Sequence, residues 1–152
     1  MPGYLFDTSA WLAAVFERHP FHGLARQALQ QATRAEPAVF CRATQQSFLR
    51  LASTAVLAKT YGVAPLTNQD ALMALDSLQA LPQVAWRDES PGVFGQWRSL
   101  AASPALASAS PKVWMDAYLA AFAIAAGLRL VTLDRDFKNY VPQGLDLVLV
   151  NP

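Results

Sequence analysis

The longest uncharged run of the chain predicts a buried helix followed by a buried strand. The twelve residues 117–128 carry no charge and follow Asp116, a run too long for an ordinary strand and too short to cross a bilayer. Gly127 is placed to end a helix, and residues 130–133 form an apolar run typical of a buried parallel strand that ends at Asp134. In a right-handed strand-helix-strand unit, the helix start and the strand end lie at one sheet edge. We therefore expect Asp116 and Asp134 to meet there.

A second strand end near the N-terminus points to the same edge. Residues 4–6 are apolar and are followed directly by Asp7, and the apolar pattern after it predicts a helix that runs to about Arg18. Thr8 or Ser9 is expected to cap that helix. Asp7 then occupies the same topological position as Asp134, and Asp136 is a third candidate for the same group of carboxylates.

The remaining pattern alternates short strands with amphipathic helices. Segment 55–66 is predicted as a frayed helix end followed by a loop, and segment 103–111 as a loop. Asp88-Glu89 is predicted as a solvated turn. The whole pattern predicts an α/β fold with three α/β/α layers and a mainly parallel central sheet of about five strands. Further helices are expected at 21–34, 43–54, 67–80 and 94–102, and further strands at 38–41, 84–86 and 145–150.

Composition narrows the class of protein. The chain has 152 residues, 53% of them hydrophobic, which suits a single domain over residues 1–152. No secretory leader or membrane span is apparent, so a cytoplasmic protein without a membrane partner is expected. The one cysteine, Cys41, excludes an internal disulfide and a cysteine-based zinc site.

The charge balance depends on where the acids lie. The net charge is only +1, but setting aside four aspartates of the eleven acidic residues leaves seven acids against twelve lysines and arginines. The rest of the surface is then basic, which suits a polyanionic substrate.

A group of carboxylates of this kind predicts metal chemistry. Carboxylates held together repel one another unless a cation neutralises them, and oxygen ligands suit Mg²⁺, for which Mn²⁺ can substitute. Such ions promote phosphodiester hydrolysis by activating water and stabilising the leaving oxygen. The candidate site residues are Asp7, Asp116, Asp134 and Asp136, with hydroxyl support from Thr8, Ser9 and Thr132.

Each acid also has a purely structural interpretation. Asp7 and Asp116 could cap helices, Asp134 could belong to a turn, and Asp136 could be only solvated. These alternatives stay open at the level of the sequence.

Three segments together resemble the PIN domain, and within it the VapC ribonuclease toxins of type II toxin-antitoxin pairs. They are YLFDTS at residues 4–9, DAYLA at 116–120 and LVTLDRDF at 130–137, and the resemblance covers almost the full length. It implies that Asp7 and Asp116 bind Mg²⁺, with Asp134 and Asp136 completing the acidic pocket. It also implies an endoribonuclease that cuts tRNA or ribosomal RNA, forms a homodimer and is blocked by a VapB antitoxin.

One position departs from that family. Many members carry a glutamate early in the helix after the second strand, where this chain has Gln45. Gln45 is still a candidate site residue, because a neutral amide can hold a metal-bound water. It contributes less charge to a pair of cations, so a second metal is in doubt. The departure favours an alternative, an inactive PIN-like module that binds RNA or protein. A third hypothesis, a haloacid-dehalogenase-like phosphatase with its nucleophile in the segment 134–136, expects that motif after the first strand.

Overall fold

The computed structural model describes residues 3–102 and 109–151. Within them a five-stranded, entirely parallel sheet has the strand order β3-β2-β1-β4-β5. The first strand in sequence therefore lies at the centre, and the chain builds outward from it in both directions. The strands are β1 (Tyr4–Phe6), β2 (Ala38–Phe40), β3 (Val84–Trp86), β4 (Arg129–Thr132) and β5 (Asp146–Leu149).

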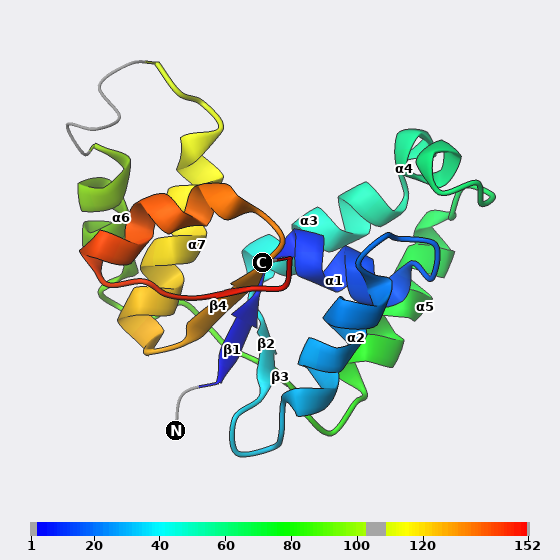
Figure 1. Cartoon of the computed structure of the whole chain (residues 1–152), viewed down its shortest axis with the longest axis horizontal. Helices are drawn as coiled ribbons and strands as arrows, with labels where there is room; N and C mark the ends of the chain where they lie inside the picture. Colours follow the sequence, from blue (N-terminus) through cyan, green and yellow to red (C-terminus); the bar gives the residue numbers. More distant parts are fainter. Residues whose placement is uncertain (1–2, 103–108, 152) are drawn as a thin grey trace.

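Helices cover both faces of this sheet (Figure 1). The helices that precede β3 pack on one face, and those that follow it pack on the other. No helix in the described part of the chain is long and apolar enough to cross a membrane. The helices are α1 (Thr8–Val15), α2 (His22–Gln31), α3 (Arg42–Ala52), α4 (Ala55–Thr60), α5 (Asn68–Gln79), α6 (Val93–Ala101), α7 (Val113–Ala126) and the 3-10 helix η2 (Arg135–Gln143).

Alternation along the central strands explains the three layers. Phe6 and Val131 pack into the core beneath α1, α2, α3 and α5, whereas Leu5 and Leu130 pack into the core beneath α6, α7 and η2. Successive side chains of a strand point to opposite faces, so a sheet covered on both sides needs apolar residues at every position. The predicted three-layer α/β/α fold with a parallel sheet is confirmed.

Several predicted element ends are wrong for local reasons. Helix α1 is capped by Asp7 rather than by Thr8 or Ser9, and it ends at Val15 instead of near Arg18. Helix α4 forms where a frayed end and loop were predicted, because Thr54 caps it by accepting a hydrogen bond from the Leu57 backbone N–H. Of the predicted loop 103–111, positions 103–108 lie outside the described residues.

Helix α7 begins earlier than the uncharged run suggested. It starts at Val113, so Asp116 lies inside its first turn and does not cap it. The predicted stop at Gly127 is confirmed, since this residue adopts the left-handed conformation with φ of 67°. The helix start is therefore fixed only by the folded structure, whereas the stop was readable from one glycine.

Replacing Gly127 with alanine is expected to lower the free energy of unfolding by about 1 kcal/mol, because an L side chain strains the left-handed conformation. The added Cβ would meet no neighbour, so the effect reports the backbone alone. Gly95→Ala in α6 also meets no neighbour and is expected to stabilise by about 0.5 kcal/mol. Urea unfolding of both variants tests this, and a shift of the same sign in both would contradict it.

Candidate functional site

Asp7 joins the end of β1 to the start of α1. Its side chain is only 5% exposed. One carboxylate oxygen accepts hydrogen bonds from the Ala10 backbone N–H at 2.9 Å and from the Ser9 hydroxyl at 2.6 Å. The capping role considered from the sequence is therefore real, but it engages only one of the two oxygens.

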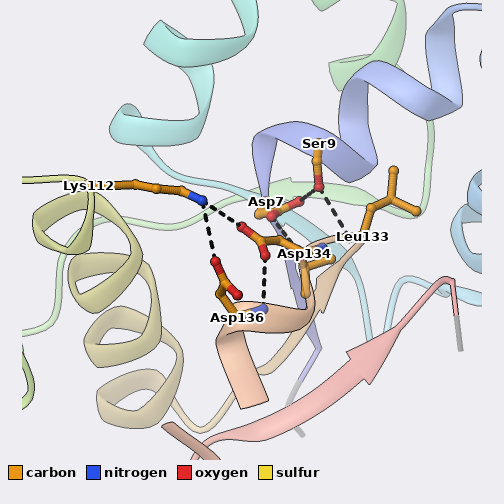
Figure 2. A network of polar contacts seen from close by, with 7 residues as sticks. Asp7, Ser9, Lys112, Leu133, Asp134 and Asp136 are labelled. Carbon is orange, nitrogen blue, oxygen red and sulfur yellow. Dashed lines mark hydrogen bonds and ion pairs between the residues drawn. The ribbon is translucent and has the colours of Figure 1, made fainter. Parts of the chain in front are cut away.

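The second oxygen of Asp7 is bound from the neighbouring strand. The Thr132 hydroxyl, fully buried at the end of β4, hydrogen-bonds to Asp7 Oδ2 and accepts from the Asp134 backbone N–H at 2.9 Å. The Ser9 hydroxyl in turn accepts from the Leu133 backbone N–H at 3.2 Å (Figure 2). These hydrogen bonds join the end of β1 to the end of β4. The network consists of Asp7, Ser9, Thr132 and the backbone of 133–134.

The position of the network follows from the topology. The crossovers from β1 to β2 and from β3 to β4 lead to opposite sides of β1, so the strand order reverses between β1 and β4. Open parallel sheets bind ligands at such a switch point, beyond the carboxyl ends of the strands. The polar network lies at that place.

Asp134 and Asp136 lie beside the network and share a lysine. Asp134 Oδ1 accepts from the Asp136 backbone N–H at 2.9 Å and so caps η2. Figure 2 shows Lys112 reaching from the start of α7 to both acids, with Nζ 3.4 Å from Asp136 Oδ2 and 3.9 Å from Asp134 Oδ2. The structural roles considered for these two acids thus coexist with their position at the switch point.

Asp116 faces the same group from α7. Its partial burial, and next the charge of Asp134, raise its pKa from 3.8 to about 6, with smaller contributions from Asp7 and Asp136 and an opposing one from Lys112. Among the described residues, none donates a hydrogen bond to its carboxylate. The structure therefore brings the four predicted aspartates into one electrostatic environment.

Opposing effects act on the pKa of Asp7. Burial raises its pKa, the hydrogen bonds from Ser9, Thr132 and Ala10 act in the other direction, and the charge of Asp134 adds to the rise. The hydrogen bonds favour the ionised form, whereas burial and the neighbouring acid penalise it. A cation at this edge would offset the part of the cost of ionising Asp7 that these hydrogen bonds do not offset.

The carboxylate oxygens suit a hard cation that keeps part of its water, rather than a cation enclosed entirely by protein ligands. In residues 3–102 and 109–151, no three Asp, Glu, His or Cys side chains are already drawn together to hold a metal ion. Two effects account for the spacing of the acids: they repel one another, and the ammonium group of Lys112 lies between two of them. Mg²⁺ keeps several waters and needs only one or two direct carboxylates, so the chemistry of the acids still suits it.

Two other predicted site residues have different surroundings. Thr8 is the first residue of α1, and in the described chain its side chain makes no hydrogen bond to the acids. Gln45 lies in the first turn of α3, where its amide accepts from Arg42 and donates to Gln79 at 3.0 Å. The amide therefore turns toward α5.

Sequence reasoning missed Lys112. Its signal was available, since it precedes Asp116 by four residues, the spacing at which side chains of one helix face neighbour each other. Its contacts with Asp134 and Asp136, however, join positions more than twenty residues apart, and no local pattern predicts them.

Comparisons with known proteins agree with the fold. The PIN domain family model matches residues 4–141, so the chain belongs to the PIN domain family. Ribonuclease VapC41 of Mycobacterium tuberculosis is 40% identical over 96% of this chain and 97% of its own length.

Solved structures of toxin-antitoxin proteins share the fold. VapBC-1 of nontypeable Haemophilus influenzae has a TM-score of 0.68 at 13% identity over 98% of both chains. VapC20 of Mycobacterium tuberculosis, a Sarcin-Ricin loop cleaving toxin, has a TM-score of 0.62 at 16% identity over 94% of this chain and 96% of its own. The resemblance to PIN domains and VapC ribonucleases seen in the sequence is confirmed.

Replacing Asp116 with asparagine is expected to stabilise the protein at neutral pH without metal. A carboxyl whose pKa rises from 3.8 to about 6 on folding holds its proton more tightly in the folded state. The wild type therefore loses stability as pH rises through 6, and the asparagine variant does not. A fully buried group would give about 3 kcal/mol, but the partial exposure of Asp116 to solvent reduces the expected gain at pH 7.5 to about 1 kcal/mol.

Thermal melting in a chelator at pH 4 and pH 7.5 measures this difference. The melting temperature of the Asp116→Asn variant should exceed that of the wild type by about 2–4 °C at pH 7.5 and by almost nothing at pH 4. Asp146→Asn, at the exposed start of β5, is the matched control. If Asp116→Asn is no more stable than the wild type at pH 7.5, burial and the neighbouring acids do not raise the pKa of Asp116.

Proposed function

We propose that this chain is a metal-dependent endoribonuclease that hydrolyses phosphodiester bonds of RNA at the carboxyl edge of its sheet. It acts as the toxin of a toxin-antitoxin pair of the VapBC type. The observation that carries the proposal is the convergence of Asp7, Asp116, Asp134 and Asp136, reflected in the raised pKa of Asp116. The identity of 40% to Ribonuclease VapC41 over nearly the whole chain supports it.

In this proposal Asp7, Asp116 and Asp134 hold Mg²⁺, for which Mn²⁺ can substitute. The bound ion supplies two effects, a lowered pKa of its water and charge stabilisation of the phosphodiester oxygens. The protein supplies orientation. Ser9 and Thr132 fix both oxygens of Asp7, so this carboxylate is held in position before a cation arrives.

Lys112 and Asp136 have auxiliary roles. Without a divalent ion, the Lys112 ammonium group is the cation nearest to Asp134 and Asp136 in the described structure. It offsets part of their repulsion and competes with an incoming metal ion. Asp136 adds negative charge beside the three proposed ligands and keeps Lys112 next to them.

The proposal needs only one metal ion. Gln45, which stands where many PIN domains carry a glutamate, contacts Arg42 and Gln79 and adds no charge to the acidic group. A second site would have to form without it. One cation held by Asp7, Asp116 and Asp134 is therefore the arrangement we propose.

The substrate and partners follow from the same relationship. We propose structured RNA of the tRNA or ribosomal RNA class as the substrate, in the cytoplasm where such RNA is found. The acids at the switch point leave basic residues in excess over the rest of the chain, which suits a polyanion. The VapBC-1 relationship supports a VapB-like antitoxin as partner, and we also propose that the toxin forms a homodimer.

A second candidate function is a PIN-like module that binds RNA or protein without cutting it. Gln45 and the lack of a closed three-ligand metal group among the described residues favour it. Calorimetry distinguishes the two, since the module would bind RNA or protein tightly and take up no Mg²⁺. The phosphatase hypothesis lacks the required order, because Asp134 follows the fourth strand in sequence and not the first.

Removing one of the proposed metal-binding carboxylates is expected to slow the cleavage of RNA strongly. Asp7→Asn or Asp116→Asn should lower the cleavage rate roughly 100- to 1000-fold, because each removes a charge that stabilises the transition state through the cation. Chelation of divalent ions should have the same effect. Cleavage of total RNA in Mg²⁺ or Mn²⁺, together with growth arrest on expression, measures it.

Asp76→Asn on the exposed side of α5 is the control and should cut RNA as the wild type does. Thr132→Val keeps the shape of the side chain but removes the donor to Asp7, and a loss of roughly 10- to 100-fold is expected. If diverse RNAs stay uncut and wild type and Asp7→Asn arrest growth equally, the nuclease proposal is wrong.

Removing the resident lysine is expected to strengthen metal binding. Lys112→Gln deletes the cation that pairs with Asp134 and Asp136, so Mn²⁺ should bind roughly twofold to fivefold more tightly by calorimetry. Lys59→Gln on α4, an exposed lysine in another part of the fold, should leave the dissociation constant unchanged. Weaker or unchanged binding in Lys112→Gln would show that the ammonium group does not compete with the metal.

A further inference from the structure

A polar pocket lies at the same edge of the sheet as the acids. It is a cavity of about 330 Å³, and its lining includes Arg42, Trp86, Asp88, Glu89 and Tyr118. Two of these are aromatic, two are acidic and one is cationic. Neither the acidic group nor the proposed hydrolysis uses any of them.

The pocket is next to the acids along the sheet. Arg42 follows β2, and Trp86 and Asp88 lie at and just after the end of β3. These two strands lie one and two strands away from β1, on the side opposite β4. At the spacing of neighbouring strands this is roughly 5–10 Å along the edge. A nucleotide adjoining a phosphate at the acids can therefore reach the pocket.

Arg42 and Trp86 give the pocket planar surfaces. The Arg42 guanidinium lies over the Trp86 ring at 4.7 Å from its centroid, and Gln45 accepts a hydrogen bond from the same guanidinium. Both side chains remain exposed, with Trp86 at 37%. Aromatic rings and guanidinium planes are the groups on which proteins stack unpaired RNA bases. The arginine is thus already held in place as a stacking partner.

Asp88 and Glu89 give the pocket oriented acceptors. Trp86 Nε1 donates to Asp88 Oδ1 at 2.9 Å, and the Tyr118 hydroxyl donates to Glu89 Oε1 at 2.6 Å. Burial and this bond raise the pKa of Tyr118, so the phenol keeps its proton and continues to hold Glu89. No donor among the described residues engages the other oxygen of either carboxylate. A carboxylate has room for several donors, so each retains acceptor capacity.

The charges of the pocket permit an RNA ligand. The lining holds Arg42 and Arg87 against Asp88 and Glu89, so it is neutral overall and does not repel a nucleic acid backbone. Its free acceptors select bases that present N–H groups. Guanine offers two adjacent donors on its Watson–Crick edge, which match a carboxylate bidentately, whereas uracil offers one.

We propose that this pocket binds a guanine base of the RNA substrate adjacent to the cleaved phosphodiester, stacking it on the Arg42–Trp86 pair and reading its edge with Glu89 and Asp88. The proposal rests on the proposed ribonuclease function and deepens it. The solvated turn expected at Asp88-Glu89 becomes the part of the chain that sets base preference.

Binding of labelled oligonucleotides to the Asp7→Asn variant tests the pocket without requiring cleavage. The probes are hexauridylate and the same strand with one G, A or C. One guanine should tighten binding roughly tenfold over hexauridylate, more than one adenine or cytosine does. Glu89→Gln, a change of similar shape, should remove most of that gain and leave hexauridylate binding unchanged, whereas the exposed control Glu17→Gln should change neither.

Trp86→Ala should weaken every probe at least fivefold through lost stacking. Trp114→Ala, at a tryptophan that is 57% exposed and lies outside the pocket lining, is the control. Equal affinity for all four probes, or equal losses in Trp86→Ala and Trp114→Ala, would overturn the proposal. Cleavage by the wild type separates the two claims. Guanine-selective binding without cleavage keeps the pocket and rejects the nuclease, and cleavage with no guanine preference does the reverse.

Discussion

A carboxylate at the end of a buried strand is stable only when hydrogen-bond donors replace the water it has lost. At Asp7 those donors come from three places, the Ala10 backbone, the Ser9 hydroxyl and the Thr132 hydroxyl. Because Thr132 belongs to β4, the requirement of one side chain joins the first strand to the fourth. The same hydroxyl binds the Asp134 backbone N–H, so satisfying Asp7 also positions the next acid.

The topology turns this local requirement into a site. The strand order reverses between β1 and β4, so the carboxyl ends of both strands open onto the same edge, and α7 delivers Asp116 there from the other layer. The acids are placed where they repel one another, which lowers stability when no cation is present. Lys112 relieves part of this repulsion from solvent, where its long side chain can move aside. The fold is thus less stable at the edge where the acids gather, which is also where their charge can bind a cation.

Much of this arrangement was readable from the sequence, because it depends on short-range signals. Strand ends followed by Asp7 and Asp134, and the left-handed stop at Gly127, are local patterns that directly reflect the parallel fold. The start of α7 was not readable, since Val113 to Met115 carry no cap and their helical state depends on packing against α6. The contacts of Lys112 and Gln45 depend on side chains distant in sequence, and the cap of α1 moved to Asp7 because a strand end and a helix start share one residue.

We propose that Asp7, Asp116 and Asp134 share one divalent cation. Anomalous diffraction from crystals grown with Mn²⁺ tests it most directly, because the scattering locates manganese without prior assumptions about its ligands. We expect one manganese peak at the carboxyl edge between β1, β4 and the start of α7, in direct or water-mediated contact with these three carboxylates. An edge without manganese, in crystals of protein that cleaves RNA in the same buffer, would contradict it.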